Sequence, residues 1–216
     1  MAAERQAIRT LYRRFPKQLI NSLPVVSYGG RIITVNTADE AREAVDFLLT
    51  QPLLGMDTET RPSFRRGEHH QVALLQVAAQ NVCFLFRLNL TGITPDIVRL
   101  LEDTTVDKVG LSWHDDMLQL THAASFKPGR FIDLQKHIGE LGVEDMSLQK
   151  LFANFFGQKI SKSQRLTNWE ADLLQDKQKQ YAAIDAWACT ELWKEFLHLK
   201  ATGNFIITDD YTQDIT

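Results

Sequence analysis

Hydrophobic residues in this chain gather in short runs that turn residues and polar residues interrupt. These runs predict strands over 53–58, 72–79 and 82–88, the last two joined by a tight Gln80-Asn81 turn. Further strands are expected within 27–37, over 107–113 and at the start of 130–141. Amphipathic periodicity and capping residues predict helices over 37–51, 94–102, 114–124, 146–156 and 177–200, and in the second part of 130–141.

The order of these segments predicts one α/β domain. Strands cluster early, and helices alternate with strands afterwards, which indicates a mixed central β-sheet with helices on both faces. We expect this domain to span 25–200. Apolar residues at helical spacing between 5 and 20 predict an N-terminal helical extension over 1–24, and residues 201–216 form a polar C-terminal tail.

Composition narrows the class of protein. The 216 residues are 44% hydrophobic and 24% charged, as in ordinary globular proteins, and the net charge of −3 argues against a passive, basic nucleic-acid coat. Two isolated cysteines give no disulfide framework, and no stretch has the length of a membrane span. We therefore expect a cytoplasmic protein that has no membrane partner.

Two carboxylates follow an apolar run in the stretch LLGMDTET. Side chains alternate along a strand, so Asp57 and Glu59 face the same way. Like charges roughly 4 Å apart repel by about 4 kcal/mol at an effective dielectric constant of about 20. Either the strand ends early and both acids are solvated, or one is protonated, or a cation lies between them.

A third acid lies on the apolar stripe of the last predicted helix. Asp185 is surrounded by alanines, and Tyr181 lies one turn earlier on the same face. An acid on a core face is rare unless it is paired, ligated or caps a backbone group.

A further pair of acids opens the helix over 114–124. Asp115 and Asp116 follow a predicted strand, where acids in a first helical turn are also favoured by the helix dipole alone.

Taken together, these motifs resemble the DEDD superfamily of 3′-to-5′ exonucleases. The best fit is its DEDDy branch, the ribonuclease D and Werner-type group, and the similarity covers roughly residues 53–197. The matching stretches are MDTET with VALLQVA, KVGLSWHDDMLQL, FIDLQ and NWEADLLQDKQKQYAAIDAWA. The resemblance implies a ribonuclease H-like exonuclease fold.

The resemblance also implies a mechanism. In this chain the family's four metal-binding acids would be Asp57, Glu59, Asp116 and Asp185, and they would hold two Mg²⁺ or Mn²⁺ ions. The catalytic tyrosine would be Tyr181. Asp116 fits better than its neighbour Asp115, because its spacing to Leu120 matches the family's D-x-x-x-L pattern. The implied reaction is hydrolysis of nucleotides from a nucleic acid 3′ end.

The implied substrate is single-stranded DNA or RNA, or a recessed duplex. Expected substrate contacts come from the first motifs and from two basic segments: Thr58, Leu75, Trp113, Phe64, Arg61, Arg65, Arg66, Lys159, Lys162 and Arg165. Each also has a simpler interpretation as a core residue or a solvated loop residue. Sequence alone leaves open the choice between RNA and DNA and the oligomeric state.

Two other functions compete with this hypothesis. One is a catalytically silent exonuclease-like module that binds nucleic acid. The other is a metal phosphatase or phosphoryl transferase, which the absence of a phosphate-cradling glycine loop disfavours.

Overall fold

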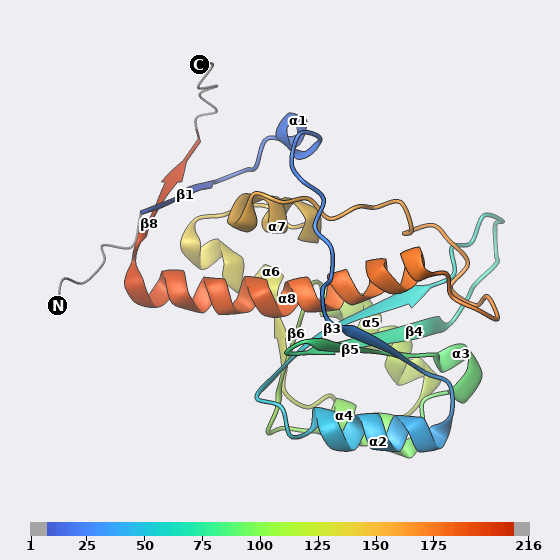
Figure 1. Ribbon diagram of the computed structural model, residues 1–216. Helices are drawn as coiled ribbons and strands as arrows, with labels where there is room; N and C mark the ends of the chain where they lie inside the picture. Colours follow the sequence, from blue (N-terminus) through green and yellow to red (C-terminus); the bar gives the residue numbers. More distant parts are fainter. Residues whose placement is uncertain (1–7, 210–216) are drawn as a thin grey trace.

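A mixed six-stranded sheet forms the centre of the molecule in the computed structural model, which describes residues 8–209 (Figure 1). Its strand order is β2-β5-β4-β3-β6-β7. β4 runs antiparallel to both of its neighbours, and the other pairs are parallel. The strands are β2 (Arg31–Val35), β3 (Leu53–Thr60), β4 (Val72–Ala79), β5 (Val82–Phe86), β6 (Asp107–Gly110) and β7 (Phe131–Asp133).

Helices cover both faces of this sheet, which confirms the predicted architecture (Figure 1). The long helix α8 (Asp176–Thr202) crosses one face, together with α6 (Leu134–His137), the 3₁₀ helix η1 (Ile138–Leu141) and α7 (Leu148–Phe156). The opposite face carries α2 (Ala38–Leu48), α4 (Pro95–Glu102) and α5 (Trp113–Ala123), with the short α3 (Leu88–Thr91) after β5.

Side chains along β4 alternate between the two faces of the sheet and so belong to the hydrophobic cores on both faces. All eight residues of this strand are buried. Leu74 and Ala78 belong to the core under α8, whereas Leu75 and Val77 belong to the core under α2 and α4. A strand covered on both faces is apolar throughout, so Gln76 is its exception.

Local signals placed several helix starts correctly. Thr37 and Glu40 form the predicted capping box at α2. Two predicted strands were too long at their carboxyl ends: β5 stops before α3, and β6 stops at Gly110. After β6, Ser112 adopts a left-handed conformation, with φ 62°, and turns the chain into α5.

The N-terminal helix predicted over 5–20 is wrong. Residues Arg9–Tyr12 form strand β1, which pairs in parallel with β8 (Phe205–Thr208), and only Lys17–Ile20 are helical, as α1. Contacts from distant parts of the chain override the local periodicity. The side chain of Asn154 bonds both the amide and the carbonyl of Tyr12, at 2.9 and 2.7 Å, and Leu11 is fully buried.

Strand β8 also lies inside the segment predicted to be a polar tail. The rest of that tail, from 210 onward, and the N-terminal residues 1–7 lie outside the described residues. The proposed division into a 25–200 domain and two extensions stays a prediction. None of the described helices is both long and apolar enough to cross a membrane.

Candidate metal centre

A glycine in β3 brings helix α8 onto the sheet. Gly55 faces α8, and a Cβ atom placed there would lie 2.0 Å from the carbonyl oxygen of Ala186. Backbone atoms cannot yield to such a contact, so only glycine permits this close crossing. The crossing places Asp185, the residue before Ala186, beside the carboxyl half of β3.

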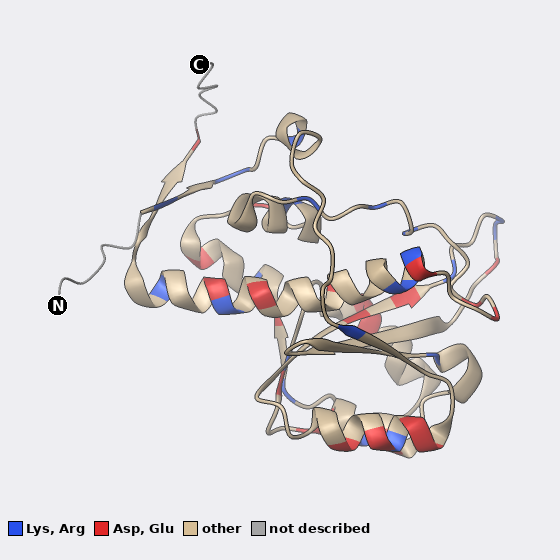
Figure 2. Ribbon diagram, in the orientation of Figure 1, with Lys and Arg blue, Asp and Glu red and all other residues tan. Residues whose placement is uncertain are grey.

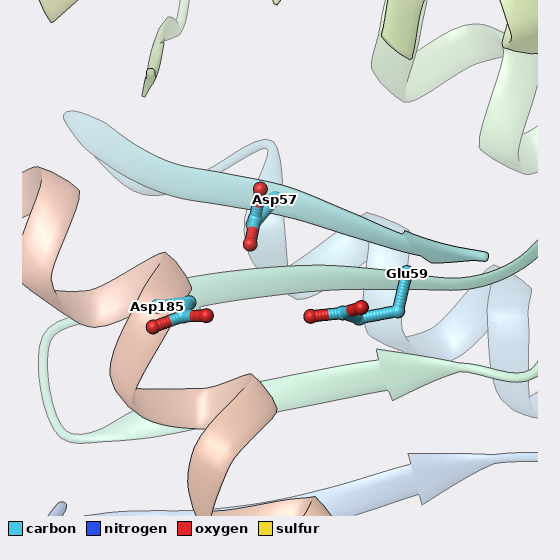
Figure 3. Close-up of side chains that lie close together, drawn as sticks. All are labelled: Asp57, Glu59 and Asp185. Carbon is cyan, nitrogen blue, oxygen red and sulfur yellow. The ribbon is translucent and has the colours of Figure 1, made fainter. Parts of the chain in front are cut away.

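Three carboxylates converge at this crossing. Asp57 and Glu59 point from β3 toward α8, and Asp185 points back from the helix (Figure 3). One oxygen from each lies within 4.8 Å of the other two. Glu59 and Asp185 are only 9% and 6% exposed. The three acids that the resemblance to DEDD exonucleases groups together therefore lie together in the fold.

The cluster is electrostatically unfavourable without a cation. Burial, then the charges of Asp185 and Asp116, raise the pKa of Glu59 to about 9. Burial raises the pKa of Asp185 to about 7, and a contact with the Tyr181 hydroxyl offsets part of that effect. The pKa of Asp57 is also raised well above its ordinary value, by burial and then by Asp185 and Glu59.

Asp116, and not Asp115, bonds to the strand that carries two of the three acids. Asp115 is exposed, whereas the carboxylate of Asp116 accepts a hydrogen bond from the hydroxyl of Thr58 on β3. Burial raises the pKa of Asp116, and the Thr58 bond works against that rise. Asp116 lies outside the group of three within 4.8 Å, yet its charge contributes to the raised pKa of Glu59.

Tyr181 lies one turn before Asp185 on α8, as predicted. It is 9% exposed and packs against Trp169, with ring centroids 6.0 Å apart. Burial and the charges of Asp185 and Glu59 raise the pKa of its phenol further above an already high value. The hydroxyl therefore keeps its proton at neutral pH and acts as a hydrogen-bond donor.

The donor set fits a hard divalent cation. All side chains in the cluster offer carboxylate oxygens, the ligands that Mg²⁺ and Mn²⁺ prefer. A cation between the carboxylates would remove the mutual repulsion that raises their pKa values. Asp57, Glu59 and Asp185 are the residues that would hold such an ion, with Asp116 beside them.

Two expected substrate contacts are core residues instead. Leu75 is 0% exposed, and Trp113 is 5% exposed and meets Phe131 edge-on, with ring centroids 5.0 Å apart. Both side chains belong to the core under α2 and α4, and Trp113 also lines a cavity of about 320 Å³ between α5 and β7. Phe64, by contrast, is 78% exposed.

Basic residues of the segment before α8 approach the carboxylates. The positive charges of Lys162 and Arg165 lower the pKa values of Asp185 and Glu59, respectively. Both belong to the polar segment 158–175, which precedes α8. Figure 2 shows basic residues of this segment and of the loop after β3 on the same side of the molecule.

A charged network that the sequence did not reveal joins these two loops. Arg61 pairs with Glu170 at 3.2 Å, and the other oxygen of Glu170 lies 3.2 Å from the His70 ring. The buried guanidinium of Arg87 donates to the carbonyls of Ala171 and Asp172 and so fixes the segment that carries Glu170. No local pattern pairs residues this far apart in the chain.

A polar cavity of about 520 Å³ adjoins the end of β3. Its lining comes from the carboxyl end of that strand, the following loop and helix α5: Thr60, Ser63, His69, His70, Gln71, Gln119, His122 and Ala123. Thr60, the strand residue in this lining, directly follows Glu59 in the chain.

A mixed sheet flanked by helices, with acids meeting at its centre, is the ribonuclease H-like architecture of DEDD exonucleases. The chain belongs to the 3′-5′ exonuclease family, whose sequence profile matches residues 32–199. It is 32% identical over 205 residues to a 3′-5′ exonuclease of Arabidopsis thaliana, covering 86% of this chain and 70% of that protein.

Other relatives are longer or more distant. The chain is 27% identical to the mouse bifunctional 3′-5′ exonuclease/ATP-dependent helicase WRN, covering 86% of this chain but only 14% of that protein. Among solved structures, the Escherichia coli RNase D matches with a TM-score of 0.68 at 20% identity, over 81% of this chain and 47% of that one. The Aedes aegypti Nibbler EXO domain matches with a TM-score of 0.70 at 20% identity, over 79% and 89%. These two likenesses confirm the fold.

Proposed function

We propose that this protein removes nucleotides from the 3′ end of a nucleic acid by hydrolysis, with two divalent metal ions, as a DEDDy-type exonuclease. One observation carries the proposal: Asp57, Glu59 and Asp185 meet within 4.8 Å in a site where burial and mutual repulsion oppose their charges. A tyrosine lies one turn from the helical acid, as the DEDDy branch requires.

A pair of Mg²⁺ or Mn²⁺ ions, when bound, would activate water and stabilise the leaving 3′ oxygen. The side chains of this chain have separate tasks. Asp57, Glu59 and Asp185 would bind and orient the ions. Thr58 donates a hydrogen bond to Asp116 and so holds the carboxylate that would bind the ion on the leaving-group side. Tyr181 keeps its proton and orients the attacking water with its hydroxyl.

The surroundings suit a polar, anionic strand. The cavity beside Thr60 has room for a terminal nucleotide and offers hydrogen-bonding side chains. Lys162 and Arg165 are close enough to Asp185 and Glu59 to lower the pKa values of these carboxylates, and positive charges at such positions attract backbone phosphates. Relatives named ribonuclease D support RNA as one substrate class.

Digestion of 3′-labelled single-stranded DNA, single-stranded RNA and a recessed duplex with Mn²⁺ tests this proposal. The wild-type protein should release single nucleotides from the 3′ end of at least one substrate, and Asp57→Ala should release none. Asp39→Ala is the matched control, because this side chain is 81% exposed on α2, on the other face of the sheet. Equal activity in wild type and Asp57→Ala would contradict the proposal.

A further inference from the structure

Gln76 is a polar residue in an otherwise apolar, fully buried strand. Its side chain is 0% exposed, and neither the carboxamide oxygen nor the nitrogen has a hydrogen-bond partner among the described residues. Leaving such groups unpaired in a core destabilises a fold, because they lose their hydrogen bonds to water and gain none in return. A methionine of similar length would avoid that loss, so packing alone does not account for glutamine here.

The sheet register places this amide beside the carboxylate cluster. Gln76 on β4 lies directly opposite Asp57 on β3, and Leu85 lies opposite on its other side. Directly opposed residues share a face and have Cβ atoms about 4.5–5.5 Å apart. The face is the one under α8, because Leu74 and Ala78 flank Gln76 in that core. Of the two residues that lie opposite Gln76 on the neighbouring strands, only Asp57 is polar.

We propose that Gln76 is a positioning residue for Asp57. Its carboxamide N–H donates to the Asp57 carboxylate when a divalent ion is bound, and so fixes which lone pairs of that carboxylate face the ion. This inference rests on the proposed function. A carboxylate has about four lone-pair sites, so binding the ions leaves a site for such a donor. Partners behind a metal ligand typically change metal affinity by about 10–100-fold when they are removed.

The test is Mn²⁺ binding by titration calorimetry with Gln76→Met, which keeps the volume and removes both polar atoms. We expect the Mn²⁺ dissociation constant to rise at least about 10-fold. Without metal, the melting temperature should hold or rise, because the variant no longer buries an unpaired amide. With substrate, kcat should fall while KM for the oligonucleotide stays within about twofold, because Asp57 acts on the ions and not on strand binding.

Gln51→Met is the matched control. Gln51 is another buried glutamine, 9% exposed, with an unpartnered carboxamide oxygen, but it precedes the opposite end of β3. This variant should leave the Mn²⁺ affinity unchanged.

The possible results separate the inference from the function on which it rests. An unchanged Mn²⁺ affinity in folded Gln76→Met would overturn the inference and leave the proposed function standing. A wild-type protein that binds no Mn²⁺ would overturn the proposed function itself. If Gln76→Met does not fold, Gln76→Leu is measured in the same way. Loss of folding in both variants would show that the amide has a structural partner, and would also overturn the inference.

Discussion

Replacing Asp185 with asparagine should stabilise the metal-free protein at high pH. The substitution keeps the shape of a side chain that is 6% exposed and removes its charge. Burial raises the pKa of Asp185 from 3.8 to about 7. Because each tenfold change in a protonation constant is about 1.4 kcal/mol, charging this carboxylate in the fold costs about 4 kcal/mol.

The sign of the pH dependence follows from proton binding. Between pH 3.8 and about 7 the folded protein holds a proton on Asp185 that the unfolded chain has lost. Wild-type stability therefore falls as pH rises through this window, and above it the full loss applies. The asparagine variant avoids this loss. For a chain of this size, about 4 kcal/mol corresponds to a melting temperature roughly 10 °C higher.

Melting curves at pH 5 and pH 9, each in EDTA and in Mn²⁺, measure this effect. In EDTA the advantage of Asp185→Asn should be larger at pH 9 than at pH 5. In Mn²⁺ the wild type should be more stable than the variant, because ion binding stabilises the wild type and the variant has lost a ligand. Asp176→Asn, at a site 99% exposed on the same helix, should shift stability by under about 1 kcal/mol. An Asp185→Asn variant no more stable than wild type in EDTA at pH 9 would refute the reasoning.

Three further substitutions probe other parts of the account. Gly55→Val should push α8 away from β3. Calorimetry should then show a loss of Mn²⁺ affinity, and digestion should show activity at least roughly 100-fold lower. Tyr181→Phe should lower kcat by about 100-fold yet leave the Mn²⁺ dissociation constant within about twofold; loss of metal binding would disprove the orienting role. Thr37→Ala breaks the α2 capping box and should lower the free energy of unfolding by about 1 kcal/mol in denaturant titration, with no change in nuclease activity.

Three of the candidate metal-binding acids could be assigned to a face of their strand or helix from the sequence, because that face depends on a local period. Asp57 and Glu59 share a face by strand alternation, and Asp185 shares one with Tyr181 by helical spacing. Periodicity places a side chain on a face but does not say which segment covers that face. The resemblance to DEDD exonucleases predicted that Asp185 lies with Asp57 and Glu59. The close crossing of α8 over β3 at Gly55 brings these residues together.

What the sequence did not predict depends on distant partners. The segment 5–20 has apolar residues at helical spacing, yet Arg9–Tyr12 within it forms a strand because β8, almost 200 residues later, offers a parallel edge. Leu75 was expected at the substrate, but its register in a strand covered on both faces buries it. The Arg61–Glu170–His70 network and the burial of Gln76 likewise depend on which loops and strands become neighbours.

Diffraction at the manganese edge from crystals grown with Mn²⁺ tests the central claim most directly. We predict two anomalous peaks about 3.5–4 Å apart, contacted by the carboxylates of Asp57, Glu59 and Asp185, with Asp116 beside one of them. Crystals that contain Mn²⁺ in solution but show no anomalous peak among these carboxylates would contradict it.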